Sequence, residues 1–191
     1  MAREEVSEKG MPTFIAMLRG INVSGHKTMK MERLRAAFEG LGFGNVQTYV
    51  QSGNVVFEAK AAAPTGIAAT LVHRIERDFG FSVPVTVVTG QEMGRIFREN
   101  PFVKEAGVDL SKLHVTFLAD TPAAAGLAKM GALPAGPDRF HWRSRCVYLH
   151  CPHGYGNTKL SNNAIERALS VGATTRNWKT VTTLHQMAVG A

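Results

Sequence analysis

The sequence has few of the features that mark disulfide-rich, membrane-spanning or acidic proteins. Two cysteines in 191 residues do not make a disulfide framework. No apolar run approaches the roughly 20 residues that cross a bilayer, so no membrane partner is expected. Acidic residues number 15 against 22 basic ones, which leaves a formal net charge of +7. The rest of the composition, 45% hydrophobic and 19% charged, is that of a globular protein with one core or two small ones.

The first ten residues also lack the apolar centre of a signal peptide. They read MAREEVSEKG and precede a second methionine, Met11. We therefore predict a disordered leader over residues 1–10 and a cytoplasmic location. The positive charge favours an anionic partner, either nucleic acid or a phosphorylated small molecule. A modestly basic protein without such a partner has the same composition.

The two cysteines lie close to three histidines, which raises the question of a zinc site. Cys146 and Cys151 belong to the predicted strand RCVYLHC. Side chains alternate between the faces of a strand, so a separation of five puts the two sulfurs on opposite sides of the sheet. A structural zinc site gathers its thiolates at one point. We predict small core residues here, and no metal.

Hydrophobic periodicity predicts a similar order of elements in both halves of the chain. Residues 11–90 give a strand from Phe14, a helix over about 30–40, a hairpin around Ser52-Gly53, a helix ending at Gly80 and a strand over 83–88. This is the split βαβ order of ferredoxin-like units. Residues 91–112 form a connecting helix and linker, and residues 113–191 repeat the order, with an alanine-rich helix opened by Thr121-Pro122 and an added C-terminal helix. We predict an α+β protein of two packed ferredoxin-like (βαββαβ-type) units, an order that suggests a structural duplication.

The glycine loop after the first strand resembles a phosphate-binding loop with one residue too many. Gly20 to Thr28 matches G-x4-G-K-[ST] except for His26, which stands between the second glycine and the lysine. One inserted residue rotates the lysine and hydroxyl by about 100° on a helix. The hairpin that follows also breaks the alternation of a parallel nucleotide-binding sheet. Two alternatives remain for this loop. It binds an anion in a way that differs from the phosphate-binding loop, or it is a plain strand-to-helix turn whose cations are solvated.

The stretch from Gly154 to Val181 is rich in cations, hydroxyls and amides around Trp178. Such groups hold anionic or flat ligands, but they contain no complete catalytic set, and no catalytic residue or cofactor is predicted. The candidate ligand-binding residues from both loops are Arg19, Asn22, Gly25, His26, Lys27, Tyr155, Lys159, Thr175, Arg176, Asn177 and Lys179.

Four ordered blocks of the sequence resemble a known family. They read LRGINVSGHKTMKM, TYVQSGNVVF, GNTKLSNNAIERAL and ATTRNWKTV, and they span most of the chain after Met11. In order and spacing they resemble the domain-of-unknown-function 1697 family. The resemblance implies a compact α+β protein with ferredoxin-like elements. It implies no activity, cofactor or site residue.

Three functions fit these patterns. The first is a binding module for an anionic ligand, nucleic acid or a phosphorylated molecule, with five aromatic residues as candidate stacking platforms: Tyr49, Trp142, Tyr148, Tyr155 and Trp178. The second is an enzyme acting on a small anionic metabolite, with His26 or His153 moving protons. The third is a protein–protein interaction scaffold. The polar density of 154–179 favours the first, although Trp178 also fits a core indole that anchors the terminal helix. The sequence leaves the oligomeric state open.

Overall fold

The continuous apolar run after Met11 forms a central strand of a four-stranded antiparallel sheet. The computed structural model describes residues 11–23 and 25–190, so the predicted leader lies outside the described residues. The strands of this first sheet are β1 (Thr13–Leu18), β2 (Gly44–Tyr49), β3 (Asn54–Glu58) and β4 (Val85–Thr89). Their spatial order is β2-β3-β1-β4, and each neighbouring pair is antiparallel.

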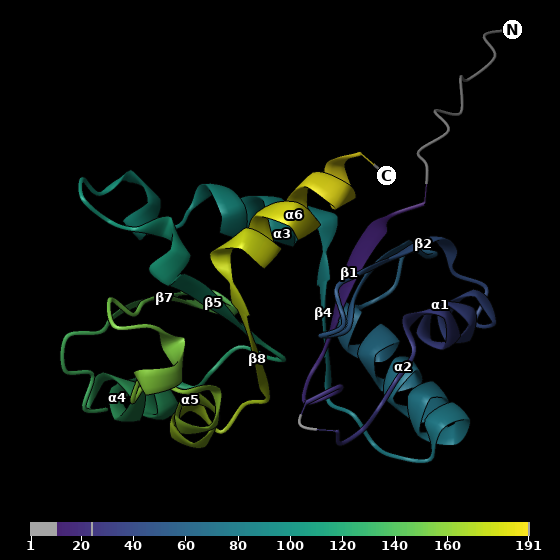
Figure 1. Ribbon diagram of the computed structural model, residues 1–191, viewed down its shortest axis with the longest axis horizontal. Coiled ribbons are helices and arrows are strands. Elements are labelled where there is room, and N and C mark those ends of the chain that lie inside the picture. Colours follow the sequence, from purple (N-terminus) through teal and green to yellow (C-terminus); the bar gives the residue numbers. More distant parts are fainter. Residues whose placement is uncertain (1–10, 24, 191) are drawn as a thin grey trace, which may run out of the picture.

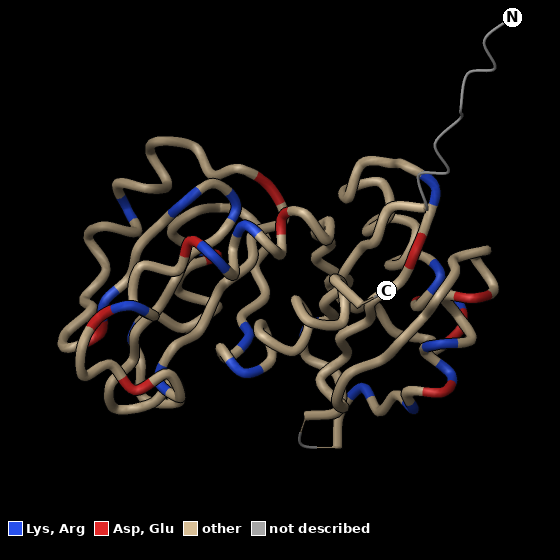
Figure 2. Tube along the Cα trace, turned by 90° about the horizontal axis from the view of Figure 1, so that it is seen from above, with Lys and Arg blue, Asp and Glu red and all other residues tan. Residues whose placement is uncertain are grey.

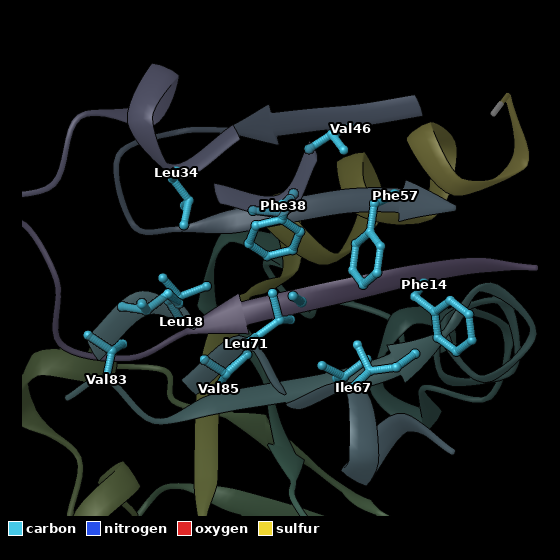
Figure 3. Close-up of a cluster of buried hydrophobic side chains, with 14 of the residues drawn as sticks. Phe14, Leu18, Leu34, Phe38, Val46, Phe57, Ile67, Leu71, Val83 and Val85 are labelled. Carbon is cyan, nitrogen blue, oxygen red and sulfur yellow. The ribbon is translucent and has the colours of Figure 1, made fainter. Parts of the chain in front are cut away.

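Two helices cover one face of this sheet, α1 (Met31–Glu39) and α2 (Pro64–Phe79). Each buries an apolar stripe spaced at three to four residues, as an amphipathic helix should. Figure 3 shows Leu34 and Phe38 of α1, and Leu71 of α2, lying over the strands. Phe38 meets the ring of Phe57 on β3 edge to face at 5.1 Å. The buried side chains between this face and the two helices form one hydrophobic core.

A second four-stranded sheet has the same order. Its strands are β5 (Leu113–Leu118), β6 (Arg139–Arg143), β7 (Cys146–His150) and β8 (Ala173–Asn177), arranged β6-β7-β5-β8 with antiparallel neighbours. The helices α4 (Ala124–Gly131) and α5 (Asn162–Leu169) pack on one of its faces. The described chain is thus a mixed α+β fold with two four-stranded antiparallel sheets, as the α+β prediction required.

The two sheets share a third core through two further helices, α3 (Gly90–Arg98) and α6 (Trp178–Val189). Figure 1 shows α3 and α6 together across both halves of the molecule, and the two helices are in contact. Ile15 and Met17 from β1 belong to this cluster together with Val115 and Phe117 from β5. Because β1 is buried on both faces, its sequence is continuously apolar instead of alternating.

Short one-turn helices complete the connections. They span Pro101–Lys104, Leu110–Lys112 and Tyr155–Asn157. A capping box begins α3, because Thr89 accepts from the amide of Glu92 and Glu92 accepts from the amide of Thr89, both at 3.0 Å.

The structure confirms that the cysteines are core residues on opposite faces of the second sheet. Cys146 belongs to the core shared with α3 and α6, whereas Cys151 packs toward α4 and α5. Burial raises the pKa of Cys146 to about 11 and also raises that of Cys151. Within residues 11–23 and 25–190, no three His, Cys, Asp or Glu side chains are grouped to hold a metal, and no helix is long and apolar enough to span a membrane.

Candidate functional site

Arg176 on β8 lies at the junction of the two sheets, with its guanidinium directed into the protein. Its Nε donates to Asn54 Oδ1 at 2.6 Å, and its terminal nitrogens donate to the carbonyls of Thr175 at 3.0 Å, Ser52 at 3.1 Å and Leu18 at 2.5 Å. At most one of the five N–H donors is left for a ligand. Burial lowers the pKa of Arg176 to about 10, so the group stays charged at neutral pH. No carboxylate among the described residues lies within ion-pair distance of it.

Arg19 makes a second set of polar contacts across the same junction. It follows β1 and forms an ion pair with Glu166 on α5. It also donates to Asn163 Oδ1 at 2.6 Å and to the carbonyl of Ala173 at 3.4 Å. Arg19 and Arg176 therefore join the end of β1 to α5 and β8, two elements of the other sheet's half.

The glycine loop is folded by its own asparagine. Asn22 accepts from the amide of Met29 at 2.7 Å and donates to the carbonyls of Met29 and Gln51, both at 2.9 Å. The Lys27 ammonium donates to the carbonyl of Ser82 at 2.7 Å. Because α1 begins four residues later, at Met31, Lys27 does not lie on a first helical turn as the phosphate-binding lysine does. His26 and Gly25 are exposed in this loop.

Tyr155 and Thr175 meet through one asparagine on α5. The Tyr155 hydroxyl accepts from the amide of Asn162 at 2.9 Å, and Thr175 donates to Asn162 Oδ1 at the same distance. The Tyr155 ring stacks on His114 at 4.7 Å, and burial lowers the pKa of that histidine. Lys159 is exposed nearby. The structure thus gathers Arg19, Asn22, Thr175 and Arg176 near the junction, but they bond chiefly to protein atoms.

Asn177 and Lys179 belong to a different place, a surface pocket of about 980 Å³ beside the first turns of α6. We call it the α6 pocket. It is lined by Phe97 and Arg98 of α3, by Val103, Lys104, Leu110 and Ser111 of the following segment, and by Asn177, Trp178, Lys179, Thr182 and Thr183. Three segments far apart in the sequence therefore form one concavity of the size that holds a small molecule.

The charged residues of the α6 pocket are all cations. Arg98, Lys104 and Lys179 are exposed, and none of them has an ion-pair partner within the described chain. Among the residues that the structure describes, no aspartate or glutamate lines the pocket. The first turn of α6 adds amides without intrahelical acceptors and the positive end of the helix dipole. Its N-cap, Asn177, accepts from the amide of Thr180 at 2.8 Å. The two earlier amides of the helix, those of Trp178 and Lys179, are then the donors open to a ligand.

The remaining wall of the pocket is apolar. Trp178 is 6% exposed and stacks on Phe97 with centroids 5.4 Å apart and planes at 1°. The interpretation of Trp178 as a core indole is therefore confirmed. Val103 and Leu110, by contrast, are 37% and 46% exposed at the rim. An anionic group and an apolar group can both be accommodated here.

Sequence reasoning missed every residue of this pocket that precedes Asn177, among them Arg98, Val103, Lys104 and Leu110. They fall in the segment predicted to be a connecting helix and linker. The available signal was a pair of large apolar residues, each close to a lysine, in a stretch with no element to bury them. Of the proposed stacking platforms, Tyr148 is wrong, because it is fully buried and donates to the carbonyl of Ile96 at 3.1 Å. Burial also raises its pKa.

These observations define a mixed α+β protein with two joined four-stranded sheets and a cationic pocket beside a helix N-terminus. Residues 11–148 match the family described as protein of unknown function (DUF1697), and the chain belongs to that family. The predicted family is confirmed, and the matched residues include the blocks LRGINVSGHKTMKM and TYVQSGNVVF.

Among solved structures, the chain is similar to the conserved bacterial protein SP0830 from Streptococcus pneumoniae. The TM-score is 0.71 at 21% sequence identity, over 94% of this chain and 99% of that one. At this identity the likeness shows the fold alone. Comparison with curated proteins finds no match.

Proposed function

We propose that this protein binds a small anionic ligand in the α6 pocket. The observation that carries the proposal is the charge of the pocket. Among the described residues, its three cations have no acidic partner and its lining has no carboxylate. An anion there gains attraction from Arg98, Lys104 and Lys179 and from the helix dipole. No protein group has to be displaced for it to bind.

A small ligand is favoured over a nucleic acid by how the charge is distributed. Figure 2 shows blue and red positions interspersed over both halves of the trace. A polynucleotide needs a continuous basic surface that follows its backbone. The α6 pocket is instead a local concentration of positive charge. The exposed loop residues His26, Lys27 and Lys159 stay predicted ligand contacts, as part of a second surface.

The location of the pocket also fits an interpretation of the whole fold. We interpret the chain as two ferredoxin-like units, since the elements from β1 to β4 and from β5 to β8 share the βαββαβ order and the same strand order. In a structural duplication, α3 and α6 are equivalent helices, each following the fourth strand of its unit. The pocket then lies where the two equivalent helices meet, a place that neither unit has alone.

The test is a titration with 8-anilinonaphthalene-1-sulfonate (ANS), an anionic aromatic probe, followed by its fluorescence. We expect one probe per folded chain, and weaker binding of N-phenyl-1-naphthylamine, which has the same rings without the sulfonate. Lys179→Ala should weaken ANS binding about fivefold, equivalent to ~1 kcal/mol for one partly exposed charge. The matched control is Lys129→Ala, an exposed lysine on α4 outside the pocket.

Equal affinities of the two probes, together with no effect of Lys179→Ala, would contradict an anion site. Anisotropy of labelled single-stranded RNA at two salt concentrations provides the nucleic-acid comparison. Submicromolar RNA binding that falls steeply with salt, and falls further in Lys159→Ala than in Lys179→Ala, would favour a polyanion surface on the loops instead.

A further inference from the structure

The α6 pocket carries a second chemical feature besides its charge, namely exposed apolar side chains held in fixed positions. Val103 and Leu110 are two of the few large hydrophobic residues exposed in the described chain. Both lie at this pocket, next to the Phe97–Trp178 stack. Apolar surface gathered in a concavity, as opposed to scattered singly, marks a site that binds an apolar group.

Local turns enforce the exposure of these two residues. Val103 follows Phe102, which is buried and lies under the guanidinium of Arg139 at 5.0 Å. The turn is capped by Asn100, whose side chain accepts from the amide of Phe102 at 3.0 Å. With Phe102 anchored inward, Val103 is held at the surface.

Leu110 is fixed in a similar way. It opens the turn Leu110–Lys112, which is capped by Asp109 through a 2.8 Å bond from the amide of Ser111. That cap sets the direction of the turn, and Leu110 is left 46% exposed against the pocket. Two separate capped turns thus present one aliphatic side chain each to the same concavity.

A purely polar anion would not use this surface. Inorganic phosphate or a sugar phosphate would leave Val103, Leu110 and the edge of the aromatic stack in water. The hydroxyl of Thr183 is partly taken, because it donates to the carbonyl of Lys179 at 3.1 Å and lies 3.4 Å from the hydroxyl of Tyr49. The cations and the apolar wall together fit a molecule that has an anionic head and an apolar body.

We infer that the ligand of the α6 pocket is an amphiphilic anion, an aryl or alkyl carboxylate or phosphate ester. Its head lies at Lys179 and the first turn of α6, and its body lies against Leu110, Val103 and Phe97. This inference rests on the proposed function and adds the class of ligand. The carboxylate and the phosphate ester share the same recognition chemistry, and matched head groups on one alkyl chain distinguish them.

The experiment is displacement of ANS from the intact protein by hexanoate, octanoate, decanoate and octyl phosphate. Inorganic phosphate, glycerol 3-phosphate and 1-octanol are the comparison ligands. If the body is buried, affinity rises with chain length, up to about fourfold for each added CH2. Leu110→Ser should reduce this dependence on chain length. Val189→Ser, at a residue 72% exposed outside the pocket, should leave it unchanged.

The results distinguish failure of the amphiphilic ligand class from failure of the anion site. Affinity that rises with chain length, and that depends on Leu110 and Lys179, supports both. Displacement by inorganic phosphate or glycerol 3-phosphate as effective as that by decanoate overturns the amphiphile and leaves the anion site. Octanol binding as tightly as octanoate, with no effect of Lys179→Ala, overturns the anion site itself. Leu110 is half exposed, so Leu110→Ser leaves the fold intact, which thermal unfolding checks.

Discussion

Arg176 and Gly53 show how single residues hold the junction between the two sheets. The carbonyl of Ser52 and the side chain of Asn54 both accept hydrogen bonds from Arg176. Gly53, between them, has a φ of +77°, and a Cβ at this position would lie 2.6 Å from Ile21 Cδ1. The turn therefore needs glycine for its conformation and for its close approach to Ile21. A guanidinium bonded to neutral acceptors then fixes that turn to β8.

Arg176→Ala should destabilise the protein by about 2–4 kcal/mol, because it leaves Oδ1 of the buried Asn54 and the carbonyls of Leu18 and Ser52 without their donor. Urea unfolding followed by circular dichroism measures the change. The control is Lys159→Ala, an exposed lysine with no ion-pair partner in the described structure, which should fall within about 0.5 kcal/mol of the parent. An unchanged midpoint accompanied by loss of ANS binding would return Arg176 to the role of ligand contact that its sequence context suggested.

Among the elements, α4 and α5 approach each other closely at a glycine. A Cβ on Gly126 of α4 would lie 3.0 Å from both Cα and O of Leu169, at the end of α5. These are backbone atoms, which cannot rotate away as the end of a side chain can. Gly131, the last residue of the same helix, has no atom within 4 Å of the corresponding position. The two glycines therefore form a matched pair on one element.

Gly126→Ala should destabilise the protein by about 1–3 kcal/mol, since the two helices must separate to admit a methyl group. Gly131→Ala should be neutral or stabilising by up to about 1 kcal/mol, because alanine has the higher helix propensity and no contact opposes it. Thermal unfolding of the two variants side by side measures the difference. Equal effects at both positions would mean that α4 and α5 adjust their separation freely.

Elements were predictable from the sequence wherever their cause is local. The apolar period of α1 acts within a few residues, and the helix predicted from it over about 30–40 is confirmed. The predicted start of α4 at Thr121-Pro122 is wrong by a few residues, because the N-cap is Ala123 and the helix begins at Ala124. The α6 pocket could not be predicted from the sequence, since Lys104 and Lys179 line one pocket only after both sheets pack on α3 and α6.

At the scale of the whole molecule, the shared third core couples the two halves. Each sheet has a face covered by its own pair of helices and another face buried against α3 and α6. Trp178 and Leu184 of α6 lie in the same cluster as Ile15 and Val88 of the first sheet. Separating the halves would expose these side chains to water at roughly 25 cal/mol per Å² of apolar surface. Neither half completes its structure without the other.

The intact chain should therefore unfold in a single transition. Its two tryptophans report on two places, because Trp142 lies on β6 of the second sheet and Trp178 lies in the shared core. Tryptophan fluorescence therefore follows the second half and the shared core, and not the helices that cover the first sheet. Far-ultraviolet circular dichroism reports on both halves. We expect coincident urea transitions by the two probes, because loss of the shared core removes the support of both sheets at once. Arg176→Ala should shift both curves together. If fluorescence changes at a clearly different urea concentration from circular dichroism, the halves are independent domains, and the α6 pocket would then be an interface that opens before either half unfolds.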